Sequence, residues 1–370
     1  MEQIGKYKVI DVIASGGSGV VYRAVDPSLG RVVAIKTLSA YSGAESEIRN
    51  RFFSEARSAA ALSHKNIITI FELNDDPLLP NIVMEYLEGE DLKHLISRRV
   101  AVPIEQKLRM LIEVCEGLSC AHGMGVIHGD IKPANIFVTR AGTVKLLDFG
   151  IARTASMDIS QPDTSMGTPA YMSPEQLGGQ PHDQRTDIFS LGVVAYELLT
   201  YVRPFRSETE LSTVFKIMQT NPEPIENVEP MIPIELSSVI GGMLEKNPEK
   251  RYRHAKDLQR ELESIILLLE ERKRILRVEI RDALANLEEF IVKNRNLVGE
   301  IEGITARMRL TAPEFLETAI PPDSCRFSPW RRELQLDYAR LLEMQEQVRR
   351  EFDRALALVE KNEAAIRDTD

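Results

Sequence analysis

The chain has 370 residues, 43% of them hydrophobic and 28% charged, which is typical of a folded globular protein but large for one ordinary core. Its 56 acidic residues outnumber its 46 basic ones, and the formal net charge of −10 argues against a general nucleic-acid binder or a protein of anionic membrane surfaces. Three cysteines are too few for a disulfide framework, and the longest strictly apolar run, 265–269, is far shorter than the ~20 residues of a membrane span. We therefore expect a soluble, cytoplasmic protein without a signal peptide, built from two domains or from one domain with an extension.

The first ~95 residues carry the pattern of an antiparallel sheet with one inserted helix. Several segments rich in β-branched residues are separated by turn residues, which predicts strands. One segment between them is rich in Ala, Arg and Glu and has apolar residues at helical spacing. The expected strands are 7–13, 20–25, 31–36, 67–73 and 81–86, and the expected helix is 45–62.

Helices dominate the middle of the chain. Apolar residues recur every three or four positions between Leu108 and His122, which predicts a helix with one buried stripe. A short hairpin is expected next, and a polar stretch after it is typical of a mobile loop. The hairpin strands are expected at 135–139 and 143–147, the loop at 154–165, and further helices at 187–200, at 208–219 and in several segments up to 262.

The composition changes near residue 264, where Glu, Arg and Leu become abundant. Apolar residues spaced by threes and fours predict two long helices, 263–308 and 330–366, joined by a Pro-rich break at 311–329. A continuous helix over 263–308 would be ~70 Å long and would not be stable alone. The extension could fold back as a hairpin, pack on the preceding domain, or pair between chains as a coiled coil. We favour a hairpin that also mediates dimerisation or binds a partner helix.

A glycine cluster, Gly16, Gly17 and Gly19, follows the first predicted strand. A dinucleotide-binding fingerprint would require a helix after these glycines, whereas the sequence continues as a strand. The cluster therefore predicts a hairpin whose backbone N–H groups could cover phosphates. A plain β-turn is an equally good interpretation of this segment alone.

Motifs further along the chain supply the context. Lys36 ends a predicted strand, and Glu55 lies in the following helix as a plausible ion-pair partner. The segment 128–135 reads His-Gly-Asp-Ile-Lys-Pro-Ala-Asn, and Asp-Phe-Gly at 148–150 and Ser-Pro-Glu at 173–175 follow it. In this order and spacing, the motifs resemble a bacterial eukaryotic-like (Hanks-type) serine/threonine protein kinase over about residues 7–264.

The resemblance implies an α+β, two-lobed kinase domain at 1–264, followed by a helical hairpin or coiled-coil extension at 265–370. An antiparallel-sheet lobe with one helix is expected at about 1–87, and a larger, mainly helical lobe at 88–264. The implied activity is transfer of the γ-phosphate of ATP, bound with Mg²⁺, to Ser or Thr hydroxyls of proteins, including the chain itself.

The catalytic roles are carried over from the resemblance. Asp130 would orient the attacking hydroxyl and accept its proton, and Lys132 would stabilise the transferred phosphate. Lys36, held by Glu55, would contact the α- and β-phosphates. The implied metal ligands are Asn135 and Asp148, both hard oxygen donors that suit Mg²⁺.

The nucleotide site is also implied by the resemblance. Met84 would be the gatekeeper beside the adenine, and backbone groups of Glu85 and Leu87, in the hinge segment 85–87, would hold the base. The full implied set is Ile13, Ala14, Ser15, Gly16, Gly17, Ser18, Gly19, Val20, Val21, Ala34, Lys36, Met84, Glu85 and Leu87.

Other residues match structural positions of the family. Glu175 and Arg251 are expected to form a buried ion pair, and Asp187 to brace the catalytic loop. His128 is interpreted as a structural residue stacked beside Phe149 rather than as a base. Thr168, next to Gly167, would belong to the loop that docks a peptide substrate.

Two positions depart from the family pattern. Ala14 replaces the first glycine of the loop, which is a mild change. Gly129 replaces the arginine that in relatives binds a phosphorylated activation loop through charge-assisted hydrogen bonds. We therefore expect phosphorylation at Thr164 or Ser165 to couple weakly to activity.

Two other function classes compete with an active protein kinase. A pseudokinase scaffold could recruit partners through the helical extension, but pseudokinases usually lose at least one of the catalytic residues, and all are present here. Small-molecule kinases can share a His-Gly-Asp triplet, but they generally lack the Gly-Thr-Pro and Ser-Pro-Glu segments. We therefore favour an active protein kinase.

Overall fold

The structure is a computed structural model that describes residues 2–16, 19–38, 45–76, 78–149 and 169–293, with a few single positions between 299 and 354. The chain divides into two compact units, Met1–Leu267 and Leu268–Asp370. The predicted loop at 154–165, the Pro-rich break and most of the second long helix lie outside the described residues.

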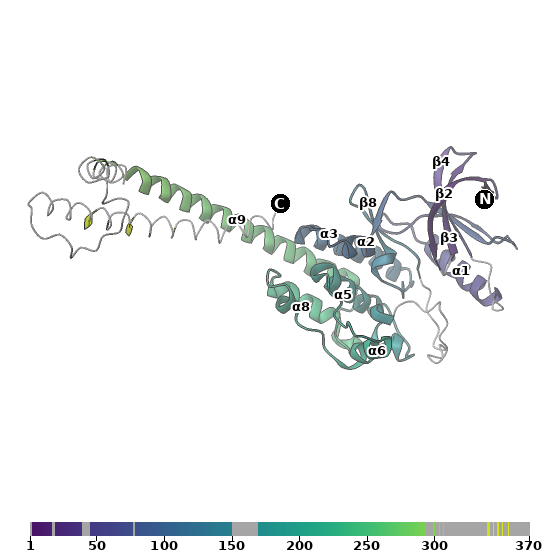
Figure 1. The fold of residues 1–370 in the computed structure, drawn as a ribbon. Coiled ribbons are helices and arrows are strands. Elements are labelled where there is room, and N and C mark those ends of the chain that lie inside the picture. The colour runs from purple at the N-terminus through teal and green to yellow at the C-terminus, as the bar shows by residue number, and fades with distance from the viewer. Residues whose placement is uncertain are drawn as a thin grey trace, which may run out of the picture. The chain divides into compact units, whose positions relative to one another are not determined.

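The first unit begins with a six-stranded antiparallel sheet, here called the sheet lobe, in which the strand order is β1-β2-β3-β4-β6-β5. The helix α1 (Glu45–Ala60) lies in sequence between β4 and β5. The strands are β1 (Gln3–Ile4), β2 (Tyr7–Gly16), β3 (Gly19–Asp26), β4 (Arg31–Thr37), β5 (Ile70–Asn74) and β6 (Asn81–Glu85). These elements confirm the predicted strands and helix, and Figure 1 shows α1 beside the sheet.

Two apolar clusters hold the sheet lobe together. One joins the strands through side chains such as Tyr7, Ile35 and Val83, and the other packs Phe52 and Phe53 of α1 near Ile82. The strand expected at 67–73 begins later, at Ile70, because Ile67 forms a parallel bridge with Leu146 of the other lobe.

The rest of the first unit is the helical lobe, which contains a small three-stranded sheet in the order β7-β8-β9. The hairpin of β8 (Ile136–Thr139) and β9 (Val144–Leu146) confirms the prediction, whereas the sequence pattern did not indicate β7 (Gly89–Asp91). The helices are α2 (Leu92–Ser97), α3 (Ile104–Gly123), α4 (Pro174–Leu177), α5 (Arg185–Thr200), α6 (Glu210–Gln219), α7 (Ile225–Val228) and α8 (Ile234–Met243).

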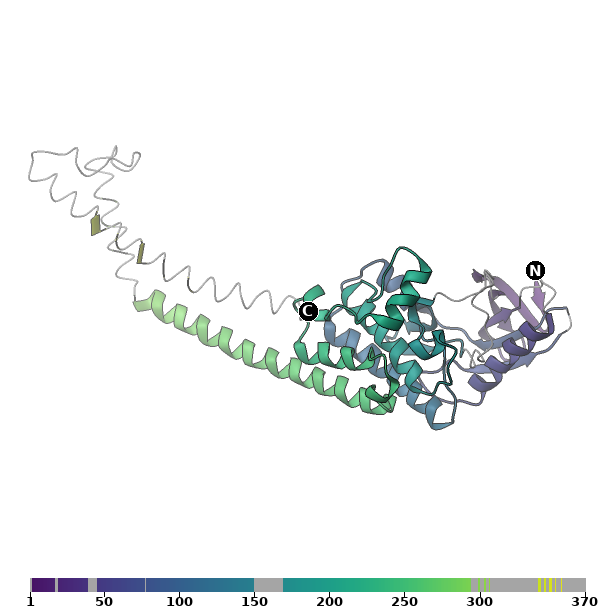
Figure 2. The ribbon, with the colours of Figure 1, turned by 90° about the horizontal axis from the view of Figure 1, so that it is seen from below.

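Helix α5 forms the centre of the helical lobe. Almost every one of its side chains is buried, including those of Asp187, Phe189 and Val193. A helix that is apolar around its whole circumference must be surrounded by other elements, and α3 and α8 both pack against α5. The helices gather around α5, apart from the strands of the sheet lobe, in both ribbon views (Figures 1 and 2).

The last described helix, α9 (Ala255–Lys293), starts inside the first unit and continues into the second. Its first turns bury Leu258, Leu262 and Ile265, whereas Ile275 and Val278 further along are exposed. The helix therefore begins at Ala255, ahead of the predicted start at 263, because the apolar spacing runs through the change in composition. Among the described residues, no helix is long and apolar enough to cross a membrane.

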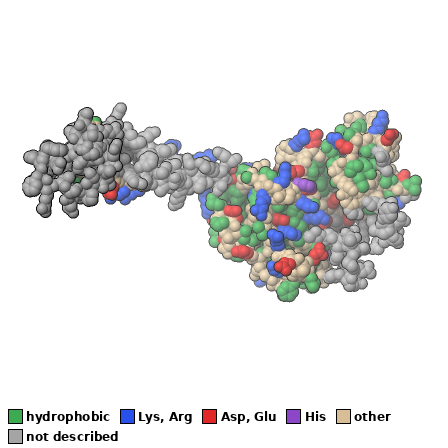
Figure 3. All heavy atoms as spheres, in the orientation of Figure 1, with side chains coloured by type: hydrophobic (Ala, Val, Ile, Leu, Met, Phe, Trp, Pro, Cys, Tyr) green, Lys and Arg blue, Asp and Glu red, His purple; other side chains and the backbone are tan. Residues whose placement is uncertain are grey.

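The described surface mixes side chains of every kind. Figure 3 shows Lys and Arg side chains gathered near the middle of the visible face, among hydrophobic and acidic ones. Leu211 and Phe215, one turn apart on α6, are both exposed, and exposed apolar residues are common on surfaces of folded proteins. Although the chain as a whole is acidic, basic side chains are concentrated in the middle of the face that is seen.

Candidate active site

Gly16 and Gly19 of the glycine cluster are the last paired residues of β2 and β3, at the end of their hairpin. Gly19 has a φ of +136°, and a Cβ atom there would lie 1.8 Å from the carbonyl oxygen of Thr37. Only glycine tolerates both the conformation and this close approach. The cluster is therefore followed by a strand, as predicted, and not by the helix that a dinucleotide fingerprint requires.

Several predicted nucleotide-binding residues lie on the strands of this hairpin and on two further strands of the sheet. Ile13, Ala14 and Ser15 lie on the exposed end of β2, and Val20 and Val21 lie opposite them at the start of β3. Ala34 on β4 is the register partner of Met84 on β6. Gly17 and Ser18 lie outside the described residues.

A pocket between the sheet and α1 brings four predicted site residues together: Lys36, Glu55, Met84 and Asp148. Phe149 and apolar side chains of α1, β5 and β6 complete its wall. These residues come from distant parts of the sequence, and the fold gathers them where the two lobes meet.

An ion pair links the two lobes in this pocket. Lys36 Nζ donates to Asp148 Oδ2 at 2.7 Å, and the side chains are 12% and 48% exposed. Desolvation favours the neutral form of Asp148, but the Lys36 ammonium outweighs it and holds the pKa of Asp148 below its usual value. Glu55 lines the same pocket, and its expected contact with Lys36 stays a prediction.

The catalytic-loop residues form a second cluster. Lys132 Nζ donates to Asp130 Oδ2 at 2.6 Å. Asn135 Nδ2 donates to the backbone oxygen of Asp130 at 2.9 Å and to its Oδ2 at 3.0 Å. The structure therefore brings Asp130, Lys132 and Asn135 together, and the carboxylate of Asp130 is held by two donors.

Asp187 fixes the backbone that carries Asp130. Its buried carboxylate accepts the N–H groups of His128 at 2.9 Å and Gly129 at 2.8 Å, and His122 Nε2 lies 2.8 Å away. Desolvation opposes the charge of Asp187, but the neighbouring histidines and N–H groups outweigh it, so that its pKa is lowered. The bracing role expected for Asp187 is confirmed.

His128 is held as a neutral ring. Its Nε2 donates to the carbonyl oxygen of Leu147 at 2.9 Å, while its Nδ1 accepts the N–H of Asp130 at 3.3 Å. Complete burial lowers the pKa of His128, which favours this neutral form. Its ring centroid lies 4.5 Å from that of Phe149, as expected for a structural residue.

Gly129 makes backbone contacts where relatives carry an arginine side chain. Its carbonyl oxygen accepts Gln176 Nε2 at 2.9 Å, and its φ of +72° lies in the left-handed region that favours glycine. The catalytic loop is thus tied to α4 and α5 through the backbone of Gly129, without a guanidinium at this position.

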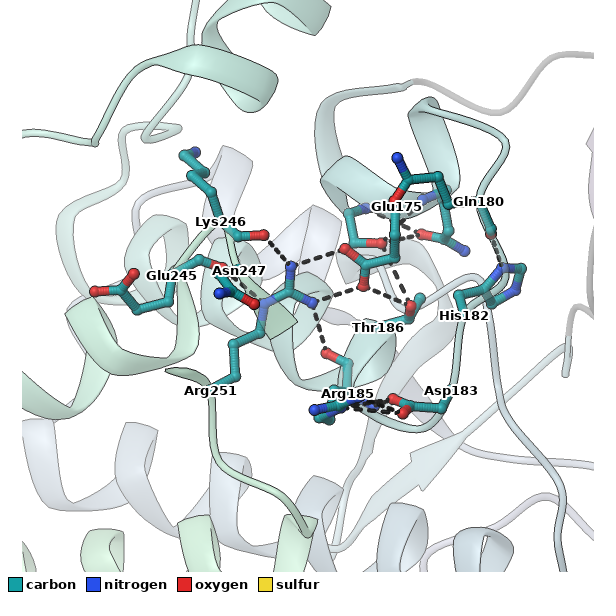
Figure 4. A network of polar contacts seen from close by, with 12 residues as sticks. Glu175, Gln180, His182, Asp183, Arg185, Thr186, Glu245, Lys246, Asn247 and Arg251 are labelled. Carbon is teal, nitrogen blue, oxygen red and sulfur yellow. Dashed lines mark hydrogen bonds and ion pairs between the residues drawn. The ribbon is translucent and has the colours of Figure 1, made fainter. Parts of the chain in front are cut away.

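The floor of the helical lobe carries the expected ion pair between Glu175 and Arg251, shown in Figure 4. Arg251 donates from its two terminal nitrogens to the two carboxylate oxygens of Glu175, at 2.6 and 2.8 Å. Thr186 Oγ1 donates to the same carboxylate at 2.8 Å. The remaining guanidinium donors reach the backbone oxygens of Arg185, Glu245 and Lys246, so that the buried cation is fully satisfied.

The segment expected to dock a peptide is described only from Pro169 onward. Tyr171 follows in the same short helical turn, and its hydroxyl donates to Glu197 Oε2 at 2.6 Å. Ser173 then caps α4, the helix that carries Glu175. Gly167 and Thr168 lie outside the described residues.

Sequence reasoning missed the side-chain role of Glu85, for which it proposed backbone contacts only. Glu85 Oε1 accepts Lys145 Nζ at 2.7 Å. The two residues are 60 positions apart, and no spacing rule in a single sequence connects them. The hinge segment 85–87 is therefore anchored by a side chain of β9.

The described residues fit a cation only together with further oxygen ligands. No group of three or more His, Cys, Asp or Glu side chains that could hold a metal ion occurs among them. The hydrogen bonds of Asn135 to Asp130 use Nδ2, so that Oδ1 is turned away from Asp130. One carboxylate, Asp148, and one amide oxygen suit Mg²⁺ that shares its coordination with phosphate oxygens and water.

Comparison with known proteins agrees with this geometry. The family model described as protein kinase domain matches residues 7–262. Serine/threonine-protein kinase PksC of Streptomyces coelicolor is 37% identical over 268 residues, covering 70% of this chain and 48% of that protein. Serine/threonine-protein kinase PknB of Mycobacterium leprae is 35% identical over 263 residues, covering 70% of this chain and 42% of that protein.

Solved structures show the same fold. The crystal structure of the Mycobacterium tuberculosis PknI kinase domain covers 71% of this chain and 97% of that chain, with a TM-score of 0.58 and 24% identity. The chain spans about two fifths of the length of the curated relatives it matches. The similarity ends near the boundary at which the second unit begins.

Proposed function

Because the chain belongs to the protein kinase family, we propose that it transfers the γ-phosphate of ATP to Ser or Thr hydroxyls of proteins, including its own. The observation that carries this proposal is that two charged clusters lie on adjacent segments, which the hydrogen bond from the N–H of Leu147 to the carbonyl oxygen of Asn135 at 2.9 Å ties together. Lys36 with Asp148 offers groups for the phosphates and a cation. Asp130 with Lys132 and Asn135 offers groups for the attacking hydroxyl.

The proposed step is a direct displacement. The hydroxyl oxygen of the substrate forms a bond to the γ-phosphorus while the bond from that phosphorus to the β–γ bridging oxygen breaks. Asp130 orients the hydroxyl and accepts its proton, and ADP leaves with the bridging oxygen. Lys132 and Lys36 offset the negative charge of the phosphate oxygens, which is most of what a protein can contribute to this reaction.

The family uses ATP with a divalent metal ion, and Mg²⁺ is the ion proposed here. When bound, it would supply positive charge that offsets the charge of the phosphates. Asp148 and Asn135 are the residues that would hold it, because both supply hard oxygen ligands. The lowered pKa of Asp148 keeps this carboxylate ionised at neutral pH.

Two features support Ser or Thr as the acceptor. Lys132 lies two residues after Asp130, where serine/threonine kinases carry a lysine, and the relatives of this chain are named serine/threonine-protein kinases. Use of ATP would place the chain in the cytoplasm.

The helical extension is proposed to bring two chains, or a chain and a partner helix, together. Exposed Ile275 and Val278 on α9 support this, because an apolar stripe on a long helix requires a covering surface. Sedimentation of the full chain beside an Ile275→Glu, Val278→Glu variant tests it. A dimer that the variant loses supports the proposal, and a monomer in both cases contradicts dimerisation.

The activity is tested by incubating the full chain with γ-labelled ATP and Mg²⁺, with and without a generic Ser/Thr substrate protein. An Asp130→Asn variant is the matched control, because asparagine keeps the size of the side chain and one accepting oxygen but cannot take up the proton. Label on Ser or Thr that is lost in the control supports the proposal. Binding of Mg-ATP without any transfer would favour a scaffold, and no binding would contradict the catalytic assignment.

A further inference from the structure

The peptide unit that precedes Asp130 is held by side chains on both of its polar groups. The carbonyl oxygen of Gly129 accepts Gln176 Nε2 at 2.9 Å. The N–H of Asp130 donates to His128 Nδ1 at 3.3 Å. Because a peptide unit is planar, fixing its carbonyl and N–H groups fixes the direction in which the backbone enters Asp130.

Gln176 reaches this peptide unit from α4, 47 positions further along the chain. Its Oε1 accepts the N–H of Ser173 at 3.0 Å, and Ser173 Oγ accepts the N–H of Gln176 at 3.4 Å, so that the two residues form a capping box. The orientation of the amide is set by its partners, because its oxygen faces an N–H group and its nitrogen faces a carbonyl oxygen. One side chain therefore closes the cap of α4 and holds the catalytic loop.

The part of α4 that carries Gln176 is firmly anchored. Its neighbour Glu175 is 6% exposed and pairs with Arg251 through two hydrogen bonds, at 2.6 and 2.8 Å. Thr186 Oγ1 donates to the same carboxylate at 2.8 Å, and the residue after Thr186 is Asp187, whose carboxylate braces the catalytic loop. The two supports of the loop, Gln176 and Asp187, are thus linked to each other and form one frame.

The same capping box follows the segment expected to dock a peptide. The short helical turn Pro169–Tyr171 ends two residues before Ser173, whose N–H is bound by Gln176. The amide of Gln176 therefore lies between the end of this segment and the loop that carries Asp130. An acceptor hydroxyl bound along the segment and the carboxylate that accepts its proton have Gln176 as a common reference.

We propose that Gln176 is a positioning residue for phosphoryl transfer, because its amide nitrogen sets the direction in which Asp130 presents its carboxylate to the acceptor hydroxyl. Lys132 and Asn135 hold the carboxylate itself, but they follow Asp130 on the same loop, whereas Gln176 is fixed by another element. Gln176 acts through the backbone of Gly129 and not through contact with the nucleotide. The inference rests on the proposed function, because it concerns the same transfer step.

The competing explanation is that Gln176 only caps α4, and the chain contains a matched control for it. Helix α6 begins with a second capping box, in which Ser212 occupies the same helical position as Gln176 does in α4. Ser212 Oγ accepts the N–H of Thr209 at 3.3 Å, and Thr209 Oγ1 accepts the N–H of Ser212 at 3.1 Å. In the part of the chain that the structure describes, the side chain of Ser212 bonds only to Thr209. Its removal therefore weakens a helix cap without touching the catalytic loop.

The test compares Gln176→Glu, Gln176→Met and Ser212→Ala in the full chain. Glutamate is a usual member of a capping box and keeps the oxygen that binds Ser173, but as a carboxylate it has no N–H for Gly129. Methionine removes both contacts and adds no charge. The measurements are kcat and KM for ATP with a generic Ser/Thr substrate protein, the Kd of Mg-ATP, the melting temperature, and hydrogen exchange of the backbone amides in 128–130.

Both Gln176 variants are expected to lower kcat about tenfold, with the KM for ATP and the Kd of Mg-ATP little changed. Amide exchange in 128–130 rises in both, because the loop loses one support. Gln176→Glu keeps the melting temperature of the native chain, since the cap is retained, whereas Gln176→Met lowers it. Ser212→Ala also lowers the melting temperature but keeps the native kcat and the native exchange of the loop.

Three outcomes would overturn the inference. A native kcat in Gln176→Glu would show that the cap alone explains this side chain. A loss in Gln176→Glu that Gln176→Met does not share would assign the effect to the added charge. An equal loss of kcat in Ser212→Ala would assign it to general destabilisation. Absence of transfer by the unmodified chain would instead contradict the proposed function itself, and amide exchange would still show whether Gln176 holds the loop.

Discussion

Two regions of the first unit contain paired charges: the pocket between the lobes, here called the cleft, and the surroundings of Glu175 and Arg251, here called the floor. The two regions differ in how far their charges are satisfied by the protein. In the floor, Arg251 is buried and donates to Glu175 and to three backbone oxygens. In the cleft, Asp148 is about half exposed and pairs with Lys36, and Asp130 pairs with Lys132. The floor charges are satisfied by the protein itself, whereas the cleft charges remain accessible to a ligand.

This difference separates stability from chemistry. Removing one partner of a satisfied, buried pair leaves a charge without compensation, which destabilises the fold. Removing a carboxylate from the cleft should change the free energy of unfolding little, because its neighbours are partly exposed and can bind water instead. Stability and activity should therefore respond to different substitutions.

The largest effect is expected on activity from Asp130→Asn. Loss of the group that orients the hydroxyl and accepts its proton should lower kcat by about 10³-fold, with the melting temperature unchanged. Initial rates with labelled ATP and a melting curve check this. A variant that is inactive because it is unfolded would break the comparison.

The largest effect on stability is expected from Arg251→Met. The buried Glu175 carboxylate would lose its cation, and the free energy of unfolding should fall by about 3–5 kcal/mol. Urea unfolding measures it, beside the double variant Glu175→Leu, Arg251→Met. The double variant should recover much of the loss, because no charge is left unpaired; equal losses would contradict this explanation.

A pH-dependent effect is expected at Asp187. Its folded-state pKa is lowered, so that its contribution to stability is fully present above the ordinary carboxyl pKa of ~4 and is lost as the pH falls toward the folded value. Asp187→Asn should cost about 2 kcal/mol at pH 7, and less on acidification below pH ~4. Urea unfolding at several pH values tests this, and a cost that is independent of pH would contradict it.

A smaller effect is expected at Lys246, where removal of the charge should raise the free energy of unfolding. Its Nζ lies 3.8 Å from the ring centroid of Phe205 and has no hydrogen-bond partner within the described part of the chain. Burial, with the nearby Arg251, lowers the pKa of Lys246 to about 8. Because the folded state holds its proton less tightly than the unfolded state, the native chain should gain stability between pH 8 and the ordinary lysine value of ~10.4.

Lys246→Met should accordingly stabilise the protein by about 1 kcal/mol at pH 7, after allowance for solvent screening and for the lost contact with the ring. The advantage should shrink as the pH rises toward 10. Unfolding curves at pH 7 and 10 provide the measurement. An advantage that grows with pH would show that the ammonium is not the cause.

The smallest effect is expected in the activation loop. Because Gly129 offers no guanidinium to a phosphorylated side chain, a Thr164→Ala, Ser165→Ala variant should keep the kcat of the native chain. The measurement is the rate of transfer to an exogenous protein substrate. Loss of most of the activity would show that the loop is ordered by a phosphate despite the absence of the arginine.

Much of the site could be predicted because its motifs are local in sequence. Asp130, Lys132 and Asn135 lie within six positions of one another, and their order and spacing indicated the catalytic loop before any contact was known. The strands of the sheet lobe were likewise indicated by β-branched runs and turn residues. Gly129 and the Glu175–Arg251 pair were recognised through the resemblance to a family.

What could not be predicted depends on contacts between distant segments. Lys36 pairs with Asp148, Glu85 with Lys145 and Asn66 with Glu113 because of the folded arrangement of strands and helices, which local sequence patterns do not reveal. The early start of α9 at Ala255 was missed for another reason: a change in composition marks where a helix becomes exposed, not where it begins.

The separation of the cleft from the floor is tested most directly by the melting temperature of the full chain with ATP, with and without Mg²⁺, beside Asp148→Asn. We expect a rise for the native chain that requires both ATP and Mg²⁺, since a ligand that binds only the folded state stabilises it. Asp148→Asn should melt like the native chain without ligand and should show no rise with Mg-ATP. A native chain that shows no rise, or an Asp148→Asn variant that shows the full rise, would contradict the assignment of the cleft charges to Mg-ATP.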